Sequence, residues 1–114
     1  MSIIIWHNSR CSKSRQTLAL LEQNGHTPII IKYLESGPNA DQIRAVLTAL
    51  AIPAINLIRT GETVFKALKL SKTDSDETLI NAMVANPILI ERPVVINGSR
   101  AAIGRPPEAV LDIL

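Results

Sequence analysis

Two short apolar runs separated by a helical pattern open the chain, and they constrain its fold more than any other feature. The first run, Ile3-Ile4-Ile5-Trp6, is β-branched, aromatic and unbroken, which is typical of a buried strand. Residues 12 to 24 carry leucines on one side and stop at Gly25, which suits the position just past a helix. Residues 28 to 33 then predict a second buried strand. Strand, helix and strand at this spacing predict a parallel pair joined by a right-handed crossover.

The middle of the chain is predicted to be helical. Asn39 and Gln42 have the spacing of a capping box, and an amphipathic stripe follows them until Pro53. Residues 54 to 70 indicate short helices, and residues 74 to 85 predict a longer one.

The last part of the chain predicts a hairpin and a closing helix. Residues 93 to 96 form an apolar run, Asn97-Gly98 is a strong signal for a tight hairpin turn, and residues 101 to 103 return as a fourth strand. Residues 106 to 114 open with two prolines and carry apolar residues at helical spacing. This order predicts an α/β fold. It is a thioredoxin-like mixed four-stranded sheet with a helical insertion between a βαβ unit and a C-terminal ββα unit.

Composition bounds the class of protein. The length of 114 residues, 46% of them hydrophobic, predicts a single domain over residues 1–114. The net charge is only +2, the sequence has three aromatic residues and it lacks an Arg/Lys-rich run, so no nucleic-acid partner is expected. The first apolar run is too short for a signal peptide, and none reaches membrane-spanning length. With one cysteine and no zinc-ligand spacing, we expect a cytoplasmic protein without a membrane partner, a disulfide or a metal.

Cys11 is the only cysteine and follows the first apolar run closely. If the helix begins near residue 12, free backbone N–H groups and the helix dipole favour a thiolate at Cys11, and the same groups can bind an oxyanion. Arg10, Lys13 and Arg15 add positive potential, so we interpret Cys11 as a nucleophile. The alternative is a buried inert thiol, the commoner state of a free cysteine. His7 either tunes the cysteine or packs at the end of the strand.

Two spacings exclude related chemistries. A tyrosine-phosphatase-like loop needs an arginine six residues after the cysteine, where this chain has Thr17. A thioredoxin-type site needs a second cysteine three residues on, where this chain has Ser14. If Cys11 performs redox chemistry, the electrons must come from an external thiol.

Five motifs resemble the glutaredoxin-linked arsenate reductases of bacteria, the ArsC type. They are HNSRCSKSR at residues 7–15, YLE at 33–35, LIR at 57–59, NPILIERPVV at 86–95 and IGRPPE at 103–108. The resemblance covers essentially the whole chain and keeps the family's order of motifs. The chain is similar to the short branch of the family, and Arg10 and Lys13 stand where the resistance enzymes carry small or neutral residues.

The resemblance implies that Cys11 attacks arsenate and carries a thioarsenate intermediate, which is released as arsenite. It places Arg59, Arg92 and Arg105 on the oxyanion. An arginine fork suits a tetrahedral dianion, because it binds two oxygens at once and stays charged. Positive charge from three segments would also offset the repulsion that opposes thiolate attack. Glutathione is the implied co-substrate, glutaredoxin the implied partner, and no bound cofactor is expected.

Supporting roles are expected for His7, Ser14, Arg15 and Pro93, and the resemblance implies a cis peptide bond before the proline. The sequence is also compatible with two alternatives. A glutathione-dependent thiol-disulfide oxidoreductase would need Cys11 but not all three arginines. A redox regulator of the same fold that binds RNA polymerase typically carries a Cys-x-x-Cys switch, which Ser14 interrupts.

Overall fold

The computed structural model describes residues 2–114, which form two compact units. The sheet unit combines the chain up to Ser36 with Arg92–Leu114, and the helical unit is Gly37–Glu91. That residues 1–114 fold as one domain stays a prediction.

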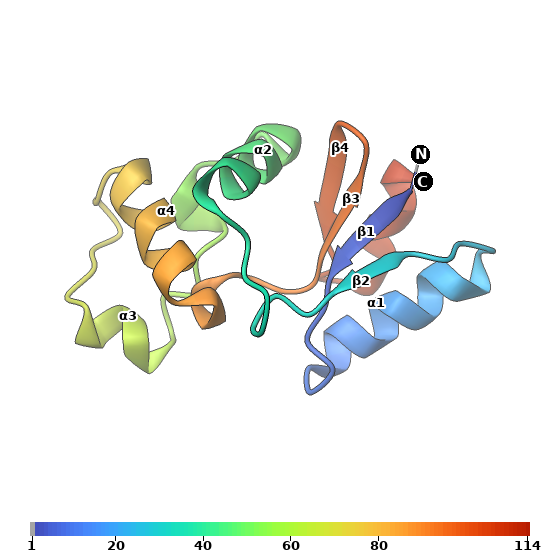
Figure 1. Cartoon of the computed structure of the whole chain (residues 1–114), viewed down its shortest axis with the longest axis horizontal. Coiled ribbons are helices and arrows are strands. Elements are labelled where there is room, and N and C mark those ends of the chain that lie inside the picture. Colours follow the sequence, from blue (N-terminus) through green and yellow to red (C-terminus); the bar gives the residue numbers. More distant parts are fainter. Residues whose placement is uncertain (1) are drawn as a thin grey trace. The chain divides into compact units, whose positions relative to one another are not determined.

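A mixed four-stranded sheet organises the sheet unit (Figure 1). Its elements are β1 (Ile3–Trp6), α1 (Ser12–Gln23), β2 (Ile29–Ile31), β3 (Val94–Asn97), β4 (Arg100–Ile103) and the 3-10 helix η3 (Pro107–Ile113). The strand order is β2-β1-β3-β4, with β1 parallel to β2 and antiparallel to β3. The predicted α/β thioredoxin-like fold is therefore confirmed, including the parallel first pair and the hairpin of β3 and β4.

The core of this unit lies between the sheet and the helices α1 and η3. Ile5 of β1 and Val95 of β3 face each other across the strands and pack with Leu21 of α1 and Val110 of η3, and all four are fully buried. Complete burial of such side chains contributes roughly 1.5–3 kcal/mol each. This packing fixes the start of α1 against the end of β1, which is where Cys11 lies.

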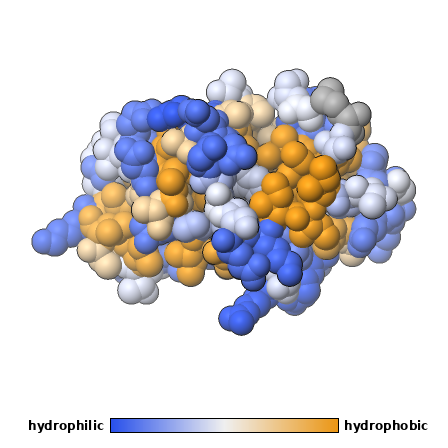
Figure 2. All heavy atoms as spheres, in the orientation of Figure 1, coloured by the Kyte–Doolittle hydropathy of each residue, from blue (hydrophilic) through white to orange (hydrophobic). Residues whose placement is uncertain are grey.

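The prediction that the second strand is buried is wrong. Ile29 and Ile30 are 50% and 45% exposed, and Figure 2 shows hydrophobic surface over β1 and β2. The reason is strand order, because β2 lies at an edge of the sheet and pairs only with β1. Only three residues, Ile29–Ile31, form the strand, and a short strand limits the hazard of an open edge.

Helices make up the second unit. They are α2 (Ala40–Leu50), η1 (Ala54–Asn56), α3 (Thr63–Ala67), α4 (Asp76–Ala85) and η2 (Pro87–Leu89). The predicted capping box is present at α2, where Asn39 Oδ1 accepts the Gln42 N–H at 2.8 Å and Gln42 Oε1 accepts the Asn39 N–H at 2.9 Å. The short helices predicted for residues 54 to 70 are confirmed as η1 and α3, whereas η2 was not predicted. Among residues 2–114, no helix combines the length and the apolar character needed to cross a membrane.

Candidate active site

The loop after β1 delivers Cys11 to the start of α1. The His7 N–H donates to the carbonyl oxygen of Ile31 at 2.9 Å, which continues the pairing of β1 with β2 up to the loop. The Cys11 N–H then donates to the Asn8 carbonyl at 3.0 Å, and the Arg15 N–H donates to the Cys11 carbonyl at 3.0 Å. Cys11 has extended backbone angles and is the N-cap residue of α1. It therefore occupies the helix N-terminus that the sequence predicts.

The environment of the Cys11 thiol lowers its pKa. Partial burial is the largest influence and raises the pKa, but the opposing groups together outweigh it. These groups are the backbone N–H groups of Ser14 and Lys13 and the guanidinium of Arg92, which contributes a hydrogen bond and its charge. In addition, Arg105 Nη2 lies 3.6 Å from Cys11 Sγ. The helix terminus and two arginines thus stabilise a thiolate at a half-buried position.

Two arginines next to the strands β3 and β4 interact with the Cys11 thiol. Arg92 lies just before β3 and Arg105 just after β4. Arg105 Nε donates to the carbonyl oxygen of Arg92 at 2.8 Å, so one side chain contacts both the nucleophile and the other arginine's backbone. The Arg92–Pro93 bond is cis, as the resemblance implies, and so is Arg105–Pro106. Two of the three expected oxyanion-binding residues are therefore placed at Cys11.

A glycine allows α1 and the end of β4 to approach each other beside these arginines. A Cβ atom at Gly104 would lie 2.4 Å from Thr17 Oγ1 and 2.7 Å from Pro93 Cγ, which is closer than real contacts allow. Thr17 is fully buried, and its hydroxyl donates to the Lys13 carbonyl at 2.8 Å. The N–H of Gly104, one residue before Arg105 in the chain, also donates to the Pro93 carbonyl at 2.9 Å.

Sequence reasoning used Thr17 only to exclude a phosphatase loop and missed its packing role. The signal lay in the spacing. Ser14, Thr17 and Leu21 follow each other at three and four residues, so they share one face of α1, and all three are buried. Two polar residues on a buried helical face indicate specific hydrogen bonds, because burial without them is costly.

His7 is buried and hydrogen-bonded to Ser14. Ser14 Oγ lies 2.6 Å from His7 Nδ1 and accepts the Asn8 N–H at 3.0 Å. Burial lowers the pKa of His7, and the charges of Lys32 and Arg15 lower it further. The imidazole is therefore neutral near pH 7, and we assign the hydroxyl proton to Nδ1 and the ring proton to Nε2. His7 thus packs at the end of the strand, and through Ser14 it holds the first turn of α1.

The other two predicted residues contact groups outside this cluster. Arg15 Nη1 donates to the carbonyl oxygen of Ser9 at 2.9 Å, which braces the loop.

Arg59 lies in the helical unit, where its side chain forms ion pairs with Glu62 at 3.0 Å and with Glu91 at 2.9 Å. Each of these three side chains is about one quarter exposed, so the ion pairs are partly shielded from water.

Comparison with known proteins shows the family to which the chain belongs. A model of the ArsC family matches residues 6–113. The arsenate reductase of Haemophilus influenzae is 47% identical over 100% of both chains, and the uncharacterized protein YfgD of Escherichia coli strain K12 is 48% identical over 96% of this chain and 94% of its own length. The solved structure of the arsenate reductase from Vibrio cholerae is 45% identical and superposes with a TM-score of 0.96, over 100% of this chain and 98% of that one. The chain therefore belongs to the ArsC family.

Proposed function

We propose that this protein is an arsenate reductase that takes its electrons from glutathione and glutaredoxin. The observation that carries the proposal is the Cys11 thiol at a helix N-terminus, with its pKa lowered and two guanidinium groups beside the sulfur. The relatives from Haemophilus influenzae and Vibrio cholerae, which bear the name arsenate reductase, support the choice of oxyanion.

In the first step the Cys11 thiolate attacks arsenic. A sulfur–arsenic bond forms, one arsenate oxygen leaves as water after it takes up protons, and arsenic stays pentavalent. Arg92 and Arg105 hold the remaining oxygens and offset the repulsion between the thiolate and the anion. Arg59 is proposed as the third arginine from the family resemblance, and Glu62 and Glu91 hold its side chain in the helical unit.

In the second step a glutathione thiolate attacks Cys11 Sγ. A disulfide forms between the two sulfurs, the sulfur–arsenic bond breaks, and its electron pair stays with arsenic, which leaves as trivalent arsenite. Each sulfur has then lost one electron and arsenic has gained two. Glutaredoxin takes the glutathionyl group from Cys11 by thiol-disulfide exchange, and further glutathione reduces glutaredoxin. This route agrees with a chain that has a single cysteine.

A coupled assay tests the proposal. Oxidation of NADPH by glutathione reductase is followed with glutathione, glutaredoxin and arsenate present, and with each omitted in turn. We expect turnover that needs all three, and none from Cys11→Ser. Turnover with a disulfide substrate but not with arsenate would contradict the proposal and favour the thiol-disulfide oxidoreductase.

A further inference from the structure

A hollow of about 190 Å³ lies beside the loop that carries Cys11. Residues 7–10 form one wall, and Lys32, Leu34 and Glu35, which follow β2, form the other. This volume exceeds the roughly 30 Å³ of one water molecule and falls below the roughly 300 Å³ of the smallest drug-sized sites. It therefore fits one end of a small peptide rather than a whole one.

The hollow and the arginines lie on different flanks of the strand that leads to Cys11. In the sheet order, β2 borders β1 on one side and β3 borders it on the other (Figure 1). The hollow belongs to the β2 side, whereas Arg92 and Arg105 approach Cys11 from the β3 and β4 side. Displacement at a sulfur atom requires the attacking group to arrive opposite the leaving group. If the oxyanion is held by the arginines, the free flank is the one from which a thiol can attack.

The charges around the hollow are available to a ligand. Arg10, Lys32 and Glu35 are exposed, and within residues 2–114 no ion pair engages their side chains. Burial lowers the pKa of His7, the charges of Lys32 and Arg15 lower it further, and the ring is therefore neutral. A ligand end that carries both a carboxylate and an ammonium group would meet opposite charges here. Leu34, 45% exposed, offers apolar contact for the methylene groups between them.

Backbone hydrogen bonds hold both walls in place without a ligand. The His7 N–H donates to Ile31 and ties the base of one wall to the end of β2. In the other wall, the N–H groups of Glu35 and Ser36 both donate to the Lys32 carbonyl at 2.9 Å and close a turn. A preformed site of this kind loses little conformational entropy on binding.

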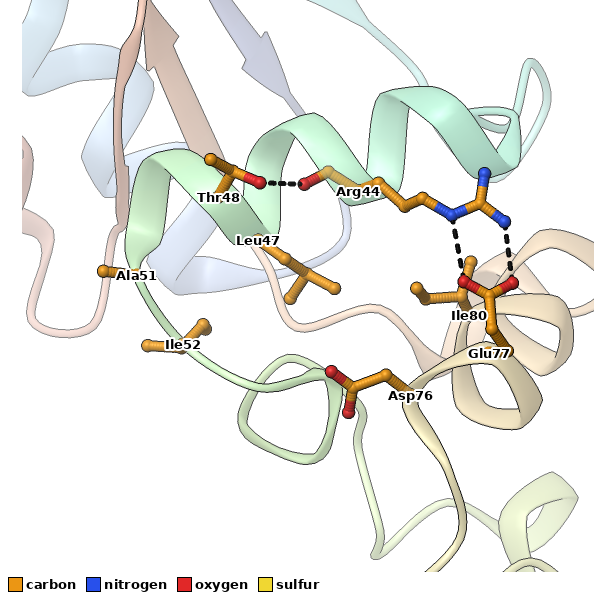
Figure 3. Close-up of a pocket in the computed structure, with 8 residues that line it drawn as sticks. All are labelled: Arg44, Leu47, Thr48, Ala51, Ile52, Asp76, Glu77 and Ile80. Carbon is orange, nitrogen blue, oxygen red and sulfur yellow. Dashed lines mark hydrogen bonds and ion pairs between the residues drawn. The ribbon is translucent and has the colours of Figure 1, made fainter.

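The groove between α2 and α4 in the helical unit differs from the hollow, because its charged side chains are paired (Figure 3). There the Arg44 guanidinium donates to both carboxylate oxygens of Glu77, at 3.1 and 2.7 Å. Asp76 accepts the Ala54 N–H, and the Thr48 hydroxyl donates to the Arg44 carbonyl. The charged groups of that groove pair with one another, whereas no ion pair engages Arg10, Lys32 or Glu35 of the hollow within residues 2–114.

We propose that the hollow between residues 7–10 and residues 32–35 binds the charged amino-acid end of a small peptide thiol, the reductant of the Cys11 adduct. Arg10 and Lys32 take the carboxylate, Glu35 takes the ammonium group, and the thiol reaches Cys11 Sγ from the β2 side. The γ-glutamyl end of glutathione has this chemistry. The identification of the ligand as a reductant rests on the proposed function, but the binding itself does not.

The test therefore uses a reaction without arsenate. The Cys11 thiolate attacks oxidised glutathione, a mixed disulfide forms on Cys11, and one glutathione thiolate leaves. The second-order rate is measured by mass spectrometry and divided by the rate with hydroxyethyl disulfide, which is uncharged and also modifies Cys11. The same Cys11 thiolate attacks both disulfides, so a change in its reactivity affects both rates equally and leaves their ratio unchanged. We expect Lys32→Ala, Arg10→Ala and Glu35→Gln each to lower the ratio about tenfold, the size expected for one charge-assisted hydrogen bond.

Arg100→Ala is the matched control. Arg100 is an exposed cation at the start of β4, in the same unit, and it does not line the hollow, so its removal should leave the ratio within about twofold of wild type. An unchanged ratio in the Lys32, Arg10 and Glu35 variants would overturn the proposal, as would an equal fall in Arg100→Ala. If the ratio falls as expected while arsenate turnover is absent, the site stands and the proposed function fails. If arsenate is turned over and the ratio does not fall, the function stands and the site fails.

Discussion

The reactivity of Cys11 depends on groups from separate parts of the chain. Backbone N–H groups come from the first turn of α1, while Arg92 and Arg105 come from the ends of β3 and β4. The thiolate is stabilised because these groups together outweigh the cost of burial. The position of Cys11 at the start of α1 was predictable from the sequence, because the strand, the loop and the helix each have a local sequence pattern. The two arginines were implied only by resemblance, because their convergence on the sulfur depends on strand order.

The lowered pKa of Cys11 predicts fast alkylation below the usual thiol range. We expect the rate of reaction with iodoacetamide to rise through an inflection below roughly 8.5, the value of an unperturbed cysteine. Arg92→Ala should move the inflection upward, because the thiolate loses a hydrogen bond and a nearby positive charge. An inflection at or above roughly 8.5 in the wild-type protein would show that the thiol is not activated.

Arg92 is predicted to be essential for arsenate turnover. Arg92→Ala should lower kcat/KM for arsenate by roughly 10²-fold or more, the usual effect of removing one group that stabilises developing negative charge. Arg44→Ala is the control, since Arg44 forms exposed ion pairs with Asp41 and Glu77 within the helical unit and should have little effect. Unchanged turnover in Arg92→Ala would show that Arg92 does not hold the oxyanion.

His7 predicts a loss of stability in mild acid. Its pKa is lower in the folded protein than the roughly 6.5 of an exposed histidine, so below that pH the unfolded chain binds a proton that the native protein does not. The free energy of unfolding should therefore fall as the pH drops from about 7 to about 5, above the range of most carboxylates. The fall should be smaller in His7→Gln, measured by urea denaturation at each pH. Equal slopes for the two proteins would contradict a neutral buried His7.

Local sequence signals predicted individual helices and strands correctly. They did not predict features that depend on how distant segments pack together. The capping box of α2 and the hairpin of β3 and β4 depend on residues close in sequence, and both are present. The burial of β2 was mispredicted, because a run of isoleucines does not reveal whether a strand lies at an edge. The contact between Gly104 and Thr17 joins a loop to a helix that is distant in sequence, so no local sequence pattern predicts it.

The close approach of Gly104 to Thr17 and Pro93 predicts that a larger residue at position 104 is destabilising. Gly104→Ala should destabilise the protein by about 1–3 kcal/mol, because the methyl group would overlap Thr17 and Pro93 in a packed site. It should also reduce arsenate turnover, because Arg105 is the next residue. Gly61→Ala is the matched control, since a Cβ there meets nothing within 4 Å. Thermal or urea denaturation of the two variants measures the difference, and equal stabilities would show that the contact can relax.

Because the chain forms two compact units, it can unfold in one step or in two. The length of the chain predicts one folding domain, and one domain of this size normally unfolds in a single transition. Trp6, the only tryptophan, lies in β1 and is 4% exposed, so its fluorescence reports on the sheet unit. Helical circular dichroism reports on both units. We expect the two signals to change at the same urea concentration. A separate, earlier loss of helical signal would show that Gly37–Glu91 unfolds on its own.

The sheet unit is built from two distant pieces of chain, and this affects when the site comes into being. A ribosome makes β1, α1 and β2 first, then the whole of Gly37–Glu91, and only afterwards the strands that carry Arg92 and Arg105. The central strand β1 cannot meet β3 until that last piece has emerged. During synthesis Cys11 therefore lacks the arginines that help to ionise it. Cys11 is thus translated early, but it gains Arg92 and Arg105 only when β3 pairs with β1.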